Sequence, residues 1–243
     1  MELIIIGSSS KGNSYALRAD SGAILLLEAG VPLREVKKAI GYQTSKVKAV
    51  IVSHVHSDHA KYIPEYVKAG LNVLSNVDVS NHYKDLVCIM DVGQTYHMGC
   101  SGFRVTPFDV EHDVPNFGYL IYHPEVGTIF FATDCYNLKF AIRGVNIFLA
   151  ECNYSDELLN KTVREGKTPA SQADRVRLSH MSLEHCISWL EDCEASKSAH
   201  QIFLIHGSAR HLDPKVAVSL IQRLTGVPTW YAKKGKIIPL VDK

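Results

Sequence analysis

The sequence lacks long apolar runs, low-complexity segments and paired cysteine motifs. Its hydrophobic stretches, such as Leu3 to Ile6, are far too short for a signal-peptide core or for a membrane span of about 20 residues. No stretch rich in Pro, Gly or Ser divides the 243 residues, so we predict a single domain over residues 1–243. These absences predict a soluble, cytoplasmic protein that does not bind a membrane.

Cysteine spacing and net charge exclude further classes of protein. The six cysteines include no Cys-x-x-Cys pair, which fits reduced thiols in a cytoplasm and argues against a zinc ribbon. The formal net charge of +1 gives no overall attraction to nucleic acid, so a polyanion would have to bind at local patches. The sequence leaves the oligomeric state open, a homodimer included.

One short stretch is rich in metal-binding side chains: His54-Val55-His56-Ser57-Asp58-His59, directly after the apolar run Val47 to Ser53. The pattern His-x-His-x-Asp-His should arise by chance in on the order of one chain in a thousand of this composition. Ligands two residues apart at the end of a strand project to one side of a loop. Asp58 and His59 continue onto the next helix, so one loop can serve two cations.

Other residues with imidazole or carboxylate side chains, which can bind metal or transfer protons, also follow predicted strands. The strands are expected over residues 103–110, 127–133, 145–150 and 201–205, and they lead to His112, Asp134, Glu151 and His206 respectively. Asp134 has a second interpretation as a helix cap. A helix is expected over 58–69, with Pro64 inside it as the cause of a kink or an early end.

The residues from His54 to His59 resemble the signature of the metallo-β-lactamase fold hydrolases. The loop Gly7-Ser8-Ser9-Ser10-Lys11-Gly12-Asn13 after the first strand resembles the YycJ/WalJ-like branch of that superfamily, which is regarded as nuclease-like. The resemblance implies a four-layer αββα sandwich, in which two sheets pack face to face with helices outside. Residue patterning by itself supports only the α/β class.

The resemblance also implies a dinuclear metal site. One ion would be held by His54, His56 and His112, a second by Asp58, His59 and His206, and Asp134 would bridge them. Imidazole and carboxylate ligands suit Zn²⁺ best, with Mn²⁺ or Fe²⁺ as alternatives. A hydroxide held by the metals would be the nucleophile, oriented by Asp58. Glu28 departs from the family, which usually has an Asp there to brace the metal loop.

Glu151 and His180 stand where the nuclease branches add a Glu and a His that assist the leaving oxygen. The resemblance therefore implies a metal-dependent phosphodiester hydrolase, specifically a DNA exonuclease-like nuclease. The 71 residues between Asp134 and His206 leave no room for a large inserted cap, which favours DNA ends or short strands over long structured RNA. His180 has a second interpretation as a structural histidine at a helix start.

Two segments are expected to contact the phosphates of a nucleic acid or nucleotide substrate. The small polar loop of the first strand offers backbone N–H groups and side chains, although it could equally be a plain turn. The stretch 161–177 has a net charge of +3 and could contact phosphates. Its alternative interpretation is a solvated helical surface without a binding role. The candidate residues are Ser8, Ser9, Lys11, Asn13, Arg164, Lys167, Arg175 and Arg177.

Two rival functions fit the same residues. The first is a cyclic-nucleotide or other small-molecule phosphodiesterase, which the nearly neutral net charge favours slightly. The second is a non-catalytic binding module stabilised by metal, against which the complete ligand set argues. Loss of activity without loss of the fold on chelation would exclude the binding module.

Overall fold

The computed structural model describes residues 1–84 and 86–241, whose strands form two seven-stranded sheets. The first sheet has the order β14-β1-β2-β3-β4-β5-β6, and its strands are β1 (Glu2–Gly7), β2 (Ser14–Arg18), β3 (Ile24–Leu27), β4 (Val47–Ile51), β5 (Val73–Ser75), β6 (Cys88–Ile89) and β14 (Ile237–Pro239). The second has the order β13-β12-β11-β10-β9-β8-β7, and its strands are β7 (Tyr96–His97), β8 (Arg104–Val110), β9 (Asn116–His123), β10 (Gly127–Ala132), β11 (Ile147–Glu151), β12 (Gln201–Ile205) and β13 (Thr229–Tyr231).

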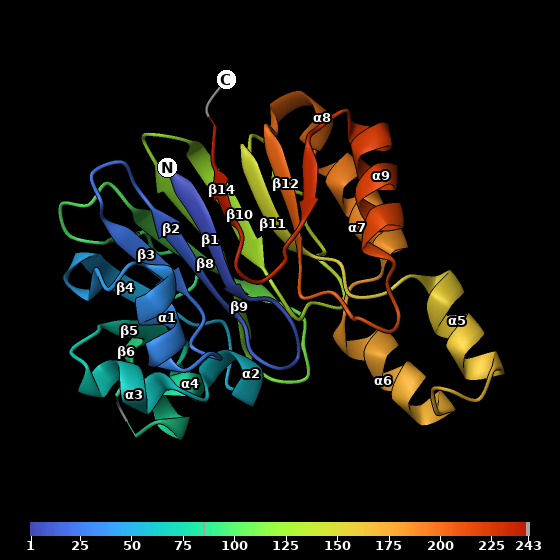
Figure 1. Ribbon diagram of the computed structural model, residues 1–243, viewed down its shortest axis with the longest axis horizontal. Coiled ribbons are helices and arrows are strands. Elements are labelled where there is room, and N and C mark those ends of the chain that lie inside the picture. Colours follow the sequence, from blue (N-terminus) through green and yellow to red (C-terminus); the bar gives the residue numbers. More distant parts are fainter. Residues whose placement is uncertain (85, 242–243) are drawn as a thin grey trace.

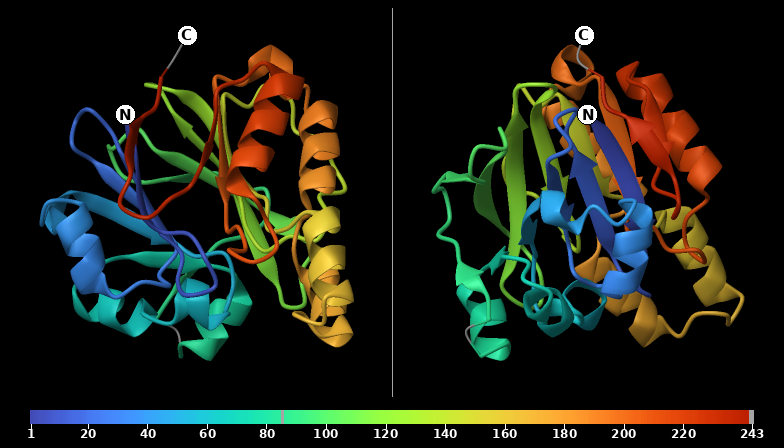
Figure 2. Two further views of the ribbon diagram at one scale, coloured as in Figure 1. Left: turned by 45° about the vertical axis from the view of Figure 1, so that its right-hand side comes forward. Right: turned by 60° about the vertical axis from the view of Figure 1, so that its left-hand side comes forward.

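Helices flank both sheets, so the predicted αββα arrangement is confirmed (Figure 1). The helices of the first half are α1 (Leu33–Ala39), α2 (Ser57–Ala60), α3 (Ile63–Lys68) and α4 (Val77–His82), with a short 3-10 turn at Thr44–Lys46. Those of the second half are α5 (Asp156–Arg164), α6 (Ala170–Ser179), α7 (Leu183–Asp192), α8 (Ala195–Ser198) and α9 (Pro214–Thr225). The two groups lie on opposite sides of the paired sheets (Figure 2). Among the described residues, no helix is long and apolar enough to cross a membrane.

Alternate residues of the central strands enter different apolar layers. Leu3 and Ile5 of β1 belong to the cluster between the sheets, together with Phe131 of β10. Ile4 and Ile6 of the same strand pack instead in the cluster beneath α1 and α3. Because both faces of these strands are covered, they are apolar throughout rather than alternating. This explains the short unbroken apolar runs in the sequence.

Two local features differ from the sequence expectation. The helix expected over 58–69 is split into α2 and α3, because Pro64 occupies the first turn of α3 and cannot donate the hydrogen bond that a continuous helix needs. Strand β13 was not anticipated, since three residues carry too little periodicity to predict a strand.

The strand directions bring the candidate site residues together. In the second sheet β10, β11 and β12 are parallel neighbours, with Ala132 paired to Ala150 and Glu151 paired to Ile205. In the first sheet β3, β4 and β5 are parallel. Side chains that follow the carboxyl ends of parallel strands meet at one edge of a sheet, where α/β proteins place their sites.

Candidate metal centre

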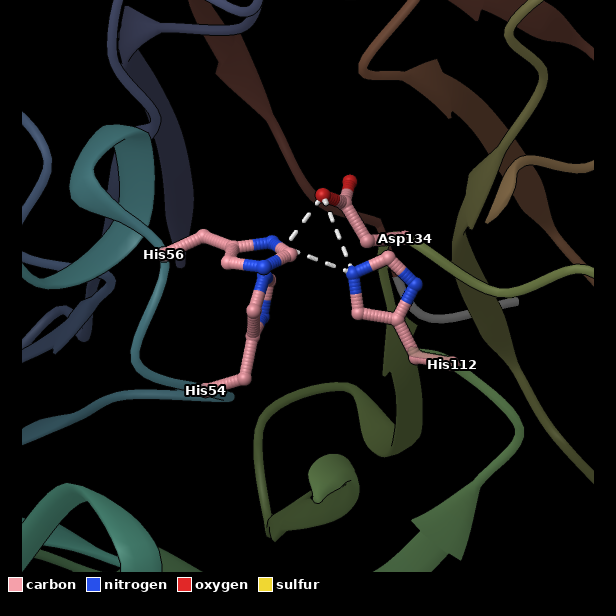
Figure 3. A group of neighbouring side chains, drawn as sticks. All are labelled: His54, His56, His112 and Asp134. Carbon is pink, nitrogen blue, oxygen red and sulfur yellow. Dashed lines mark hydrogen bonds and ion pairs between the residues drawn. The ribbon is translucent and has the colours of Figure 1, made fainter. Parts of the chain in front are cut away.

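Four side chains from three loops converge at this end of the sandwich (Figure 3). His54 and His56 follow β4, His112 lies between β8 and β9, and Asp134 follows β10. His112 Nε2 lies 3.2 Å from His56 Nδ1 and 3.9 Å from Asp134 Oδ2, which is 3.6 Å from His54 Nε2. Neighbouring ligands of a tetrahedral zinc ion with bonds of about 2.0–2.1 Å lie about 3.4 Å apart. The four atoms therefore have the spacing of ligands around one ion.

Asp134 also belongs to a second cluster, with Asp58, His59 and His206. His59 Nε2 lies 3.3 Å from Asp58 Oδ2 and 3.4 Å from Asp134 Oδ2. His206 Nε2 lies 3.4 Å from Asp58 Oδ2. These distances again match ligands of a shared ion. The structure thus brings all seven predicted ligands into two adjoining groups that share Asp134.

Contacts outside the two groups orient the rings. Ser53 Oγ lies 2.8 Å from His54 Nδ1, whereas the buried His54 Nε2 has no hydrogen-bond partner among the described residues. A buried polar atom normally has a partner, so this nitrogen fits a metal ligand. His206 Nδ1 lies 2.9 Å from Asp134 Oδ1 and 3.0 Å from Glu151 Oε1, which leaves Nε2 to face Asp58. Such outer partners fix the tautomer of a metal-binding histidine.

The pKa shifts describe a site that requires positive charge. Burial lowers the pKa of His54 and of His112, which keeps both rings in the neutral form that binds metal. Burial opposes the charge of Asp134, but the imidazoles of His206 and His59 hold its pKa well below the usual range. Burial likewise opposes the charge of His59 and His206, yet Asp134 raises both pKa values well above normal. The carboxylates thus favour positive charge at this centre, which bound divalent ions would supply.

Glu151 is buried and connects the second cluster to His180. Its Oε1 lies 2.7 Å from His180 Nδ1, and its Oε2 accepts a hydrogen bond from the Cys135 backbone N–H at 2.8 Å. Burial lowers the pKa of His180, but the carboxylate of Glu151 outweighs that effect and raises it. A separation of 2.7 Å is that of a direct hydrogen bond, shorter than the roughly 3.4 Å between ligands of one ion. Glu151 and His180 therefore fit a proton-holding pair better than a third metal site.

Glu28 reaches the metal loop despite its departure from the family pattern. It is fully buried, accepts a hydrogen bond from the Ser53 backbone N–H at 3.3 Å, and its Oε2 lies 3.6 Å from His59 Nδ1. Gly30, two residues later, lies so close to Asp58 that an added Cβ would fall 1.7 Å from its carbonyl oxygen. This segment therefore has to end in glycine to pack against the loop that carries the ligands.

Two buried asparagines hold the backbone of two candidate ligands, and sequence reasoning missed both. Asp134 and His206 have left-handed backbone conformations, with φ of 51° and 54°. Asn116 donates to the carbonyl of Asp134 at 2.9 Å, and Asn153 donates to the carbonyl of His206 at 2.7 Å. No short motif marks these amides, because Asn153 is 53 residues from its partner and Asn116 is 18 from its own.

A cavity of about 510 Å³ opens beside the second cluster and is lined by part of the predicted substrate-binding set. Ser8, Ser9, Lys11 and Arg175 line it together with His180 and His206. Ser8 Oγ also accepts hydrogen bonds from the His206 backbone N–H and from the Tyr15 hydroxyl. This side chain therefore supports the candidate ligand from the cavity wall.

The remaining residues of that set lie elsewhere. Asn13 is fully buried and its amide lies 3.0 Å from His59 Nε2, so it positions the metal loop and does not line the cavity. Lys167 pairs with Glu165, and Arg177 pairs with Asp174. Arg164 is exposed on α5 outside the cavity.

Two sheets between helical layers, with imidazoles and carboxylates clustered at their carboxyl ends, are the arrangement of the metallo-β-lactamase fold. The chain belongs to this superfamily, since residues 25–206 match the beta-lactamase superfamily domain. No curated protein matches the sequence.

Solved structures share the fold over almost the whole chain. The metallo-beta-lactamase fold protein YhfI from Bacillus subtilis is 17% identical with a TM-score of 0.76, covering 98% of this chain and 99% of its own. Human tRNase Z, short form, is 14% identical with a TM-score of 0.70, covering 100% of both chains. Yeast PDE1 is 10% identical with a TM-score of 0.65, covering 98% of both chains. At these identities the likeness shows the fold alone, and the YycJ/WalJ-like branch stays a prediction.

Proposed function

We propose that the protein is a metal-dependent phosphodiester hydrolase, specifically a nuclease of the DNA exonuclease type. The observation that carries this proposal is the hydrogen-bonded pair of Glu151 and His180 beside the two ligand clusters, at the wall of an open cavity. A metal site alone would serve many hydrolases. A positioned imidazole outside that site suits a substrate whose leaving group needs a proton. The tRNase among the structures of similar fold supports the proposal to the extent that this fold can host cleavage of a nucleic acid.

The ligand clusters would hold two divalent ions. His54, His56 and His112 would bind one, Asp58, His59 and His206 the other, and Asp134 would contact both. The nitrogen-rich set suits Zn²⁺ best, with Mn²⁺ or Fe²⁺ also suited because these ligands discriminate weakly among such ions. When bound, such ions supply Lewis acidity, which for zinc lowers the pKa of a water molecule to about 7.

The protein side chains would orient the attacking water and donate a proton to the leaving oxygen. In the hydrolysis a water oxygen forms a bond to phosphorus, the bond from phosphorus to the leaving oxygen breaks, and the leaving oxygen takes up a proton. Glu151 accepts from His180 Nδ1, so Nε2 is the nitrogen of His180 that can give that proton. Asp58, whose Oδ2 lies near His59 and His206, would orient the attacking water.

Two cations of the cavity wall would bind the substrate's phosphates. Lys11 comes from the loop after β1 and Arg175 from α6, so the cavity has positive charge on two separate elements. Of the four basic residues predicted in stretch 161–177, Arg175 is the one that lines this cavity. A phosphate between Lys11 and Arg175 would lie beside His180, which lines the same wall.

A small-molecule phosphodiesterase is the second candidate. The cavity of about 510 Å³ lies in the range that holds a single small ligand such as a nucleotide, and the net charge is only +1. The two candidates differ in their response to salt. Affinity for a polymer that neutralises several cations falls steeply with salt concentration, whereas affinity for one nucleotide falls little.

The test is a metal-dependent activity screen across double-stranded DNA, single-stranded DNA, RNA and cyclic nucleotides. We expect cleavage of DNA that depends on added divalent metal and is lost in Asp134→Asn, which removes one charge from the position shared by both clusters. Hydrolysis of cyclic nucleotides alone would favour the second candidate. A metal-loaded protein that hydrolyses no phosphodiester would contradict both.

A further inference from the structure

The cleft beside the ligand clusters has two lobes that meet at the end of α6. The first lobe is the cavity of about 510 Å³ next to His180. The second is a cavity of about 860 Å³ next to His112. Arg175 and Ser179 line both cavities, so the two lobes lie on either side of these residues. A substrate that spans the ligand clusters can therefore place one part in each lobe.

The two lobes have opposite charge. Of the described residues that line the first lobe, none is Asp or Glu, and Lys11 and Arg175 are basic, so we call it the basic lobe. Of those that line the second, Asp109, Glu111 and Asp113 are acidic and Arg175 is the one Lys or Arg. Glu111 pairs with Lys139, but Asp109 and Asp113 still outnumber Arg175, so we call it the acidic lobe. Like charges placed together cost free energy, so the acidic lobe disfavours a second phosphate. The polyanionic part of a substrate belongs in the basic lobe.

The acidic lobe also offers apolar surface. Tyr136, two residues after Asp134, lines this lobe and is 37% exposed. Leu178 of α6 lines it as well and is 69% exposed, although leucine is usually buried. A volume of about 860 Å³ can hold a nucleoside. Nucleobases stack on aromatic rings regardless of sequence, which gives Tyr136 a ligand of matching chemistry.

We propose that the acidic lobe binds one terminal nucleoside of the substrate, with its base against the ring of Tyr136, and that the enzyme cleaves the phosphodiester next to a chain end. The inference rests on the proposed function and adds to it the place where the chain end is recognised. His180 lies in the basic lobe, so the leaving oxygen belongs to the polymer on that side. The terminal nucleoside then leaves with the phosphate, and the shortened polymer keeps a hydroxyl group.

The first experiment compares a linear single-stranded oligonucleotide with a circle of the same sequence, using the metal-loaded full-length protein. We expect mononucleotides from the linear substrate and no measurable cleavage of the circle. Phosphates added to the ends of the linear substrate should lower kcat/KM at least about tenfold, because they place more negative charge in the acidic lobe. Equal cleavage of circle and linear substrate would overturn the inference and the exonuclease assignment, while leaving metal-dependent phosphodiester hydrolysis intact. Hydrolysis of no phosphodiester would overturn both.

The second experiment tests the surface of the acidic lobe. Tyr136→Ala should lower kcat/KM on the oligonucleotide by about 5- to 150-fold, the range for loss of one stacked base, and Tyr136→Phe should retain most of it. Neither change should affect methyl nitrophenyl phosphate, which has no base. Leu178→Ala, at an exposed position that cannot disturb the core, should cost about 3- to 10-fold. Leu224→Ala, at an exposed leucine on α9 outside the cleft, is its control.

Two results of the second experiment would count against base recognition in this lobe. One is an equal loss on both substrates in the Tyr136 and Leu178 variants, which would mean that these side chains support the ligand clusters. The other is unchanged activity on the oligonucleotide in all of them. Asp109→Asn should reduce the penalty for end phosphates, and an unchanged penalty would remove the charge argument.

Discussion

Replacing His180 by Ala should slow cleavage of a nucleic acid by about 10²–10⁴-fold, because the alkoxide would then depart without a positioned proton donor. That loss corresponds to about 2.7–5.4 kcal/mol of the activation barrier. The structure supports a large effect, since the ring is held by the bond of 2.7 Å from Nδ1 to the buried Glu151. A freely rotating surface histidine could not supply the same effect.

The same substitution should cost less in stability than in activation free energy. Glu151 would keep the backbone N–H groups of Cys135 and Met181 and its contact with His206, so its buried charge stays hydrogen-bonded. The loss is then confined to one hydrogen bond to a charged group, about 1.5–3 kcal/mol. Urea denaturation measures this part separately from turnover.

The assay compares a nucleic acid with a diester that has a nitrophenolate leaving group, for wild type and His180→Ala, with metal content measured in both. Nitrophenolate departs without protonation, so most of the rate loss should disappear on that substrate. His82→Ala, at an exposed histidine at the end of α4, is the matched control and should change neither rate. Equal losses on both substrates with metal retained would assign His180 a structural role. Loss of a metal ion would make it a ligand, and either result refutes the general-acid assignment.

Three further predictions concern the metals and the cavity wall. Protein purified without chelator should contain close to two divalent ions per chain by elemental analysis, and less than one would contradict the dinuclear site. Asp58→Asn keeps the side-chain shape and should lower turnover far more than stability; unchanged turnover would remove Asp58 from the mechanism. Arg175→Ala should weaken polymer binding and flatten its salt slope by about one unit, whereas Arg164→Ala, outside the cavity, should not. The same slope in both variants would count against Arg175 as a phosphate contact.

Much of the site could be predicted because its residues follow apolar strands. The runs before His54, Asp134 and His206 are short strands whose last three residues are all buried, so the sequence shows where each strand ends and which side chain comes next. The sheet order that brings these ends together came only through resemblance to a family, since periodicity does not specify which strands pair. The ligand set stays a prediction until metal is measured.

Contacts between distant segments could not be predicted. Gly30 reads as an ordinary turn residue until its approach to Asp58 is seen. The basic stretch 161–177 shows a similar limit, because its sequence does not tell which side chain lines the cavity. Residues two apart on a helix point to different sides, so Arg175 faces the cavity while Arg177 pairs with Asp174 along α6. The net charge of residues 161–177 identified this segment, but it could not identify Arg175 as the residue that faces the cleft.

The left-handed backbones of Asp134 and His206 lower the stability of the fold while they align the two ligand clusters. Each such conformation costs about 1–3 kcal/mol and persists because its surroundings enforce it, here through the amides of Asn116 and Asn153. A domain of this kind has a net stability of only about 5–15 kcal/mol. Selection for heat resistance alone would therefore favour variants that relax these two residues, and such variants would lose the alignment of the clusters while melting at higher temperature.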